Sequence, residues 1–194
     1  MAIRNTIQLG HPALKAGNKI ITDFGDPKLT QLITDLKDTM YKLGLIGIAA
    51  PQIGENYMVF ITEPRETESR PADQADEFRV YFNPKIVWES DEKIIIWEGC
   101  GSVTQASLFG PVLRPKIVEI EAQDILGKKF RFKSDGILGR VIQHEMDHCL
   151  GVEFIEKVAD YSQLKSKEFY LKDIKNSPEQ LKTQKITLKE YKPL

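Results

Sequence analysis

Two histidines four residues apart, with a glutamate directly after the first, are the strongest chemical signal in this sequence. They are His144, Glu145 and His148, within VIQHEMDHCLGVEF at 141–154. On an α-helix, residues i and i+4 lie on one face, about 6 Å apart along the axis, so both imidazoles can reach one metal ion. Glu145 lies at the edge of that face, where it can reach a metal-bound water without being a ligand. The spacing predicts a hydrolytic metal centre.

A catalytic centre of this kind needs a third protein ligand and an open position for water. No histidine follows His148, and Phe154 stands where some related motifs carry a third histidine. Glu153 and Glu156 are carboxylate candidates just beyond the helix. Cys100 is another candidate, because it follows an apolar segment and its thiolate would complete a Cys/His/His set suited to Zn²⁺ or Fe²⁺. On the residues alone these alternatives stay open, as does a buried core role for the cysteine.

Two strong helices are expected, and one of them carries the motif. The first covers 27–44, with apolar residues on one face and a glycine at its end. The second covers 134–151, with Ser134 or Asp135 as its cap. A third, weaker amphipathic stretch lies around 160–174, and the last twenty residues fit a strand, a helix or a tail.

Strand-like segments occupy the middle of the chain. They lie at 57–62, 80–90 and 92–102, and a hairpin is expected over 116–134 from alternating apolar and polar residues. The polar stretch 66–77 is predicted to be a surface loop. The pattern indicates one α+β domain over 1–194, with strands in the middle and a helix on each side.

The composition is that of an ordinary globular domain, with 41% apolar and 28% charged residues. The net charge of −1 gives no sign of DNA or membrane binding, and the start of the chain has no secretory or transit character. Two cysteines rule out a disulfide framework and favour a cytoplasmic location. Residues 157–194 hold nine Lys/Arg and five Asp/Glu, so they form a basic C-terminal helix or tail. His11, the remaining histidine, is expected at the surface.

Three segments taken together resemble the peptide deformylase family. They are LIGIAAPQ at 45–52, EGCGS at 98–102 and QHEMDH at 143–148, in the order and with the gaps that the family shows. The segment QLGHPALK near the N-terminus is also similar. The resemblance runs from about residue 7 to 155, and it implies antiparallel β-sheets packed around a central helix that carries the histidine motif.

The resemblance also implies an enzyme that removes the N-formyl group from the N-terminal methionine of new polypeptides. Cys100, His144 and His148 would bind one divalent metal ion, with Fe²⁺ as the native ion and Zn²⁺, Ni²⁺ or Co²⁺ as alternatives. Metal and Glu145 would activate water, while the Gln52 amide and the Gly101 N–H would stabilise the oxyanion. Nascent formyl-methionyl peptides are thus the expected partners, and the ribosome near its exit tunnel is a further candidate.

Around these residues, Ile46, Gly47, Ile137 and Val141 are expected to line the substrate pocket. Small residues there would let a peptide backbone approach and pair as an added strand. Glu98 and Gln143, which neighbour the ligands, are expected to orient them.

Four positions depart from the family pattern. Leu45 replaces a glycine, Gly101 replaces the leucine after the cysteine, Thr104 replaces a proline and Arg140 replaces an apolar residue. They cluster around substrate binding, so a divergent paralogue with altered substrate or low activity is an alternative to an active deformylase. Two further alternatives are a zinc endopeptidase with Glu153 or Glu156 as third ligand, and a non-enzymatic module that binds nascent chains or ribosomal RNA.

Overall fold

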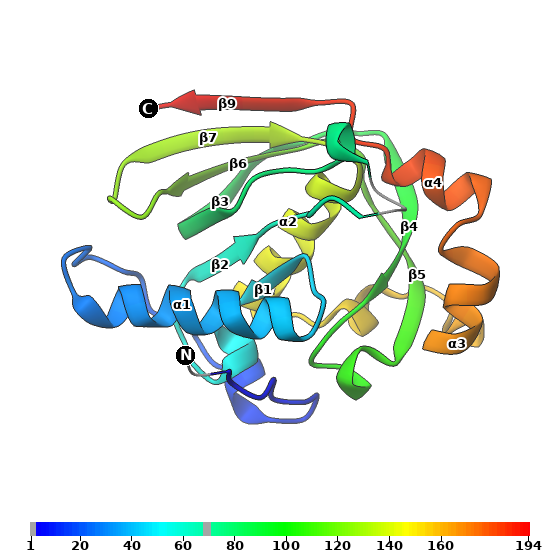
Figure 1. The fold of residues 1–194 in the computed structure, drawn as a ribbon, viewed down its shortest axis with the longest axis horizontal. Coiled ribbons are helices and arrows are strands. Elements are labelled where there is room, and N and C mark those ends of the chain that lie inside the picture. The colour runs from blue at the N-terminus through cyan, green and yellow to red at the C-terminus, as the bar shows by residue number, and fades with distance from the viewer. Residues whose placement is uncertain (1–2, 68–70) are drawn as a thin grey trace.

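The computed structural model describes residues 3–67 and 71–194, and it shows two antiparallel sheets with a helix between them (Figure 1). This helix, α2 at Gly136–Cys149, carries the histidine motif. The expected α+β class, with antiparallel sheets packed around that helix, is confirmed. Part of the loop expected at 66–77 lies outside the described residues; the remainder includes one 3₁₀ turn.

The larger sheet has six strands in the order β1-β2-β3-β6-β7-β9, all paired antiparallel. The expected strand at 57–62 and the expected hairpin at 116–134 both belong to it. In the hairpin, successive side chains point to opposite faces, so that one face is buried and the other is half-exposed. The strands are β1 (Gly47–Ala49), β2 (Val59–Thr62), β3 (Arg79–Glu89), β6 (Val118–Gln123), β7 (Lys129–Ser134) and β9 (Lys189–Pro193).

The smaller sheet has the order β4-β5-β8, with bounds Lys93–Gly99, Leu108–Pro115 and Lys165–Ser166. The strands expected at 80–90 and 92–102 therefore both exist but belong to different sheets. β5 was not among the expected strands, and its Gly110, Pro111 and Pro115 are residues that disfavour a strand. β4 pairs with β5 along its whole length, so Pro111 is opposite Trp97 in an established ladder.

Helix α1 covers Pro27–Lys42, which confirms the first expected helix. The Asp26 side chain accepts a hydrogen bond from the Lys28 N–H, and Pro27 occupies the first helical turn, where its missing N–H costs nothing. Its apolar face packs against β1 and β2 in one core cluster. Its buried members include Leu29, Leu32, Ile33, Leu36 and Met40.

Helix α2 packs on the opposite face of the larger sheet and forms the second core cluster with it. Asp135 stands at the N-cap, as expected, but its side chain makes no cap bond. Its carboxylate instead accepts from the backbone N–H groups of Thr187 and Leu188, at 2.7 and 2.9 Å. The start of α2 is therefore attached to the C-terminal segment by these hydrogen bonds.

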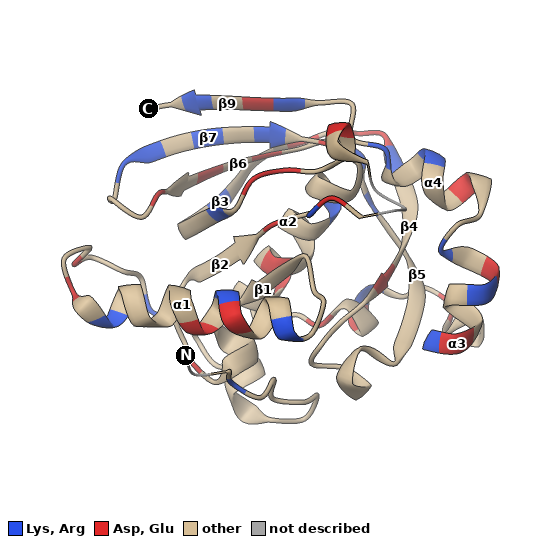
Figure 2. Ribbon diagram, viewed as in Figure 1, with Lys and Arg blue, Asp and Glu red and all other residues tan. Residues whose placement is uncertain are grey.

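The C-terminal segment beyond residue 164 wraps along the smaller sheet and then joins the larger one (Figure 1). It contains α3 (Lys167–Phe169), a π-helical turn (Tyr170–Ile174), α4 (Pro178–Gln184) and β9. The weak helix expected around 160–174 is thus present only as short turns. The buried Gln180 of α4 accepts a hydrogen bond from the Trp97 N–H of β4 at 3.3 Å. Basic and acidic residues are interspersed along these elements, with basic residues in excess (Figure 2).

Short 3₁₀ helices connect the larger elements. They lie at Pro12–Leu14, Ala50–Ile53, Ala72–Gln74, Thr104–Ala106, Phe154–Lys157 and Tyr161–Gln163. Among the helices of the described residues, none has the length and apolar character that crossing a membrane requires.

Candidate metal centre and active site

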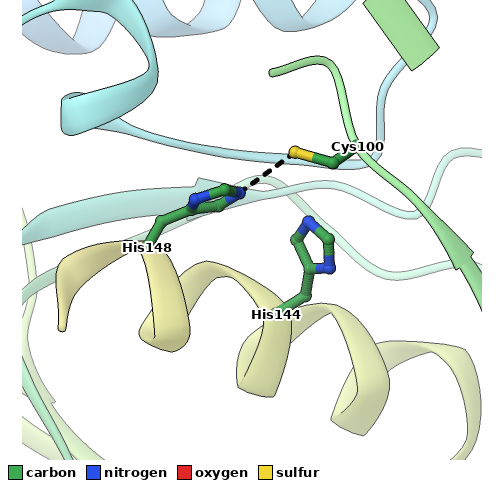
Figure 3. Close-up of side chains that lie close together, drawn as sticks. All are labelled: Cys100, His144 and His148. Carbon is green, nitrogen blue, oxygen red and sulfur yellow. Dashed lines mark hydrogen bonds between the residues drawn. The ribbon is translucent and has the colours of Figure 1, made fainter. Parts of the chain in front are cut away.

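The two sheets bring the predicted ligands together from distant parts of the chain. Cys100 directly follows β4, and His144 and His148 lie one turn apart on α2 (Figure 3). Both imidazole rings point from the helix toward the thiol, and all three side chains are buried. The Cys100 Sγ lies 3.2 Å from the His148 Nε2.

The geometry of these three side chains fits a metal ion. One donor atom from each lies within 4.8 Å of the others. Tetrahedral ligands bound at about 2.1 and 2.3 Å would lie about 3.6 Å apart, so the observed spacing needs little adjustment. A thiolate with two imidazoles is also a donor set that soft or borderline divalent ions prefer. Glu153 and Glu156 do not belong to this group among the described residues.

Glu98 holds the first histidine in place. Its Oε2 lies 2.9 Å from the His144 Nδ1, which leaves the Nε2 of that ring for the centre. Arg114 binds both oxygens of Glu98 at 2.7 and 3.0 Å and also pairs with Asp147 on α2. Burial would raise the pKa of Glu98, but Arg114 and His144 outweigh it and hold that pKa well below its usual range. Glu98 was expected to orient a ligand, and it contacts His144. Asp147 belongs to the QHEMDH motif but was given no role, and Arg114 had no signal in the sequence.

The thiol of Cys100 ionises readily in this setting. Burial would raise its pKa, but the charge of His148 and hydrogen bonds with both histidines outweigh burial and lower the pKa to about 6. The Gln52 Nε2 and the Ser102 N–H also donate to its sulfur, each at 3.3 Å. A thiolate is the form that binds metal. Burial would lower the pKa of His148, but the same pairing raises that pKa to about 10, so binding an ion would release the proton that this imidazole shares with the thiolate.

Glu145 lies in the wall of the cavity with one oxygen, Oε2, free of hydrogen bonds to the described residues. Burial raises its pKa to about 7, even though His144 and His148 act in the opposite direction. A carboxyl group with a pKa near neutrality can both accept and donate a proton. Gly47 makes room for it, because a Cβ at that position would lie 2.7 Å from the Glu145 Oε1 and 2.5 Å from the Val141 Cγ2.

Gln52 and Gly101 lie beside the thiol as expected. The Gln52 amide is fixed by its own Oε1, which accepts the Ala49 N–H at 2.8 Å. The Gly101 carbonyl accepts from Thr6 and Gln8, at 3.1 and 2.9 Å, so this glycine is held from one side. Within the described residues nothing accepts a hydrogen bond from the Gly101 N–H, which leaves that donor for a ligand.

A cavity of about 290 Å³ opens onto these groups. All four expected pocket residues line it, as do Leu45 and Arg140, which depart from the family pattern. The C-terminal segment forms another part of its wall through Lys167, Tyr170 and Gln184, which sequence reasoning did not identify. Tyr170 stacks parallel on Phe109 of β5 at 4.0 Å between ring centres. The expected pocket residues are Ile46, Gly47, Ile137 and Val141.

Two of the departures from the family pattern contact each other. A Cβ on Gly101 would lie 3.2 Å from the Leu45 Cδ1, closer than side chains normally approach. Leu45 therefore occupies the space that a side chain at position 101 would need. Thr104 also has a local reason, because its φ of 48° is a value that proline cannot adopt.

Arg140 faces the cavity but directs its guanidinium into the protein. Its Nη1 donates to Glu98 at 2.7 Å and to the Val112 carbonyl at 2.8 Å, and its Nη2 donates to the Ile94 carbonyl at 2.9 Å. It thus joins α2 to both β4 and β5. Gln143 behaves differently from expectation, since its amide donates to the carbonyls of Pro115 and Gly139 and to no ligand side chain of the described chain.

The remaining candidates lie away from the centre. His11 is exposed, as expected, and its Nδ1 accepts the Ala13 N–H. Glu156 is half-exposed and pairs with Lys15, whereas Glu153 is fully buried behind His148.

A helix that carries the HExxH motif and a cysteine at the end of a neighbouring strand together place this protein in the class of candidate metallohydrolases. Comparison with known proteins makes this specific: a family model described as polypeptide deformylase matches residues 3–164, and the chain belongs to this family. It is 34% identical over 163 residues to peptide deformylase 1 of Ralstonia nicotianae, covering 84% of this chain and 90% of the relative. It is 40% identical over 147 residues to a peptide deformylase of Chloroflexus aggregans, covering 72% and 77%.

Solved structures show the same fold. A class I type b peptide deformylase from Acinetobacter baumannii, bound to Met-Ala-Ser, superposes with a TM-score of 0.74 at 28% identity, over 81% of this chain and 99% of that chain. A peptide deformylase from Synechococcus elongatus in complex with actinonin gives 0.72 at 33% identity, over 82% and 81%. The protein is therefore an enzyme of the deformylase family, and the family implies a divalent metal and formyl-methionyl peptides as substrates.

Proposed function

We propose that this protein removes the formyl group from the N-terminal methionine of newly made polypeptides, with a divalent ion bound by Cys100, His144 and His148. The observation that carries the proposal is the convergence of these three donors, with Glu145, on one cavity. Family membership and the peptide bound to the Acinetobacter relative support the same substrate class.

The strand arrangement supports binding of an extended peptide. β1 is an end strand of the larger sheet and pairs with β2 on one side only, so its other edge can accept an added strand beside the cavity. Gly47 in this strand has no side chain to obstruct a second backbone. Ile46, Ile137 and Val141 give the cavity an apolar wall, which suits the methionine side chain.

The chemistry is a hydrolysis of the formyl C–N bond. A divalent ion in such a site lowers the pKa of water and polarises a carbonyl oxygen. Glu145 accepts a proton from the attacking water, and the Gln52 amide and the Gly101 N–H donate to the oxygen that becomes negatively charged. Glu145 then passes its proton to the departing amine as the C–N bond breaks, so formate and a free N-terminus are produced.

We propose Fe²⁺ as the native ion, because a thiolate and two imidazoles suit it; the same donors accept Zn²⁺, Ni²⁺ and Co²⁺. The proposed substrate also assigns the protein to the cytoplasm, where nascent chains emerge. The lysines of residues 157–194 support a contact with the ribosome near its exit tunnel, as a salt-sensitive interaction.

Formate release from formyl-Met-Ala tests the proposal. Anaerobically purified protein loaded with Fe²⁺, Ni²⁺ or Co²⁺ should release formate, whereas Cys100→Ala should bind far less metal and release none. Absence of turnover with all three ions would overturn the proposed activity. A Cys100→Ala variant that kept its metal, together with a Glu153→Ala variant that lost it, would instead support the endopeptidase alternative.

A further inference from the structure

Glu153 is the most deeply buried carboxylate that the proposed chemistry does not use. Its exposed fraction is 0%, and among the described residues neither of its side-chain oxygens has a hydrogen-bond partner. Leaving a carboxylate buried and unpaired is costly, so such a group needs a compensating interaction.

The backbone around Glu153 is held without help from its carboxylate. The Glu153 N–H donates to the Glu156 Oε1 at 2.7 Å, and the Glu153 carbonyl accepts the Glu156 N–H at 2.9 Å. Lys15 pairs with Glu156 and donates to the Gly151 carbonyl at 2.8 Å. The turn after α2 is therefore secured by its neighbours, and a purely structural role does not account for an acid at this position.

The carboxylate faces the second histidine of the metal centre. The Glu153 Oε1 lies 3.6 Å from the His148 Nδ1, within the range of an ion pair. That nitrogen has no hydrogen-bond partner in the described chain either, while the Nε2 of the same ring faces Cys100 at 3.2 Å. Glu153 therefore lies on the side of the imidazole away from the thiol, which excludes it as a third ligand in this arrangement.

The arrangement repeats what Glu98 does for His144. In each case a buried carboxylate faces Nδ1, and the Nε2 of the ring remains for the centre. We propose that Glu153 is a positioning residue for His148, which fixes the proton on Nδ1 and makes Nε2 a stronger metal donor. The inference rests on the proposed metal site and not on the proposed substrate.

Metal affinity tests this inference without relying on activity. Purified, metal-free full-length protein is titrated with Co²⁺ against a competing chelator, and the visible absorption of the bound Co²⁺ is recorded. Glu153→Leu removes the acceptor at similar volume and should weaken Co²⁺ binding about 10- to 100-fold with an altered spectrum. Glu153→Gln keeps an oxygen acceptor and should lose less. Glu156→Gln makes the same change of charge within the same turn and should bind like the parent.

The outcomes separate the possible roles. The inference is overturned if Glu153→Leu and Glu153→Gln bind Co²⁺ with the same affinity and the same absorption spectrum as the parent. It is also overturned if thermal unfolding of the metal-free variants shows a loss of stability that parallels the loss of affinity while the Co²⁺ spectrum stays unchanged, because that pattern indicates a structural role. If the parent itself binds no Co²⁺, the proposed metal site fails first.

Discussion

The two ends of the cavity differ in how closely they keep to the family pattern. At the metal end, Cys100, His144 and His148 stand where the deformylase motifs place them, and Glu145 and Gln52 adjoin them. Gly101, beside the thiol, is the one departure at this end. The other end, called the peptide end because the substrate is proposed to bind there, contains Leu45 and Arg140 in place of family residues. Part of its wall comes from a segment beyond the residues that the family model matches.

The difference reflects how strictly each end is constrained. Metal ligation and proton transfer need particular donor atoms at spacings fixed within a few tenths of an ångström. A wall that only contacts a peptide can be built from many side chains, provided that the total volume is kept. Variation at the peptide end is therefore compatible with unchanged chemistry at the metal end.

Glu145→Gln should give the largest effect, because it removes proton transfer and leaves the ligands intact. We expect a loss of formate release of about 10²- to 10⁴-fold with near-parental metal content. Steady-state kinetics and metal analysis measure the two quantities. The exposed-side control Glu156→Gln should retain activity. Comparable activity in both variants would show that the metal end tolerates change as the peptide end does.

The difference in thermal stability between Glu145→Gln and the parent should depend on pH. The pKa of Glu145 rises from 4.5 to about 7 on folding, so the folded protein holds this proton more tightly than the unfolded chain. Its contribution to stability is complete below about pH 4.5 and is lost as the pH rises through 7. Glutamine cannot ionise; metal-free Glu145→Gln should therefore unfold at a higher temperature than the parent at pH 8, with a smaller difference at pH 5.

Arg140→Leu should have an intermediate effect, on stability more than on chemistry. It leaves the carbonyls of Ile94 and Val112 without their donor, although Glu98 keeps Arg114 and His144. We expect a loss of about 2–4 kcal/mol in the free energy of unfolding, measured with urea. Arg131→Leu, which breaks a partly exposed pair with Glu121, should cost under about 1 kcal/mol. Equal costs would mean that Arg140 is as dispensable as a surface arginine.

Gly101→Leu should have a smaller effect on stability than Arg140→Leu, and a second substitution at Leu45 should reverse it. The added side chain meets Leu45, and overpacking of this kind costs about 1–3 kcal/mol. The double variant with Leu45→Gly restores space, so a double-mutant cycle should give a coupling energy above about 0.5 kcal/mol. Additive effects in urea unfolding would show that the two departures are independent.

Much of the site was predictable because its signals are local. The i, i+4 spacing gives two ligands on one helix face, and Asp26 with Pro27 marks the start of α1. The third ligand was not fixed by local pattern, because Cys100 reaches the histidines only through the packing of two sheets. The resemblance, and not the residues alone, chose it.

What the sequence could not indicate depends on partners distant in the chain. β5 forms despite Gly110, Pro111 and Pro115, because pairing with β4 outweighs local preference. Arg114 has no motif and becomes important only by meeting Glu98 and Asp147. Likewise, the wall residue Tyr170 follows from a chain path that no periodicity specifies.

The hydrogen bond between Gln180 and Trp97 has a consequence for self-association. β4 is an end strand, and an open edge of that kind invites another chain to add to the sheet. Gln180 occupies one of its outward N–H groups, and α4 packs alongside. The nearby edge of β1 stays available over only three residues, which is short for stable pairing between two copies. The molecule thus keeps open the edge proposed to bind a peptide while offering little template for aggregation.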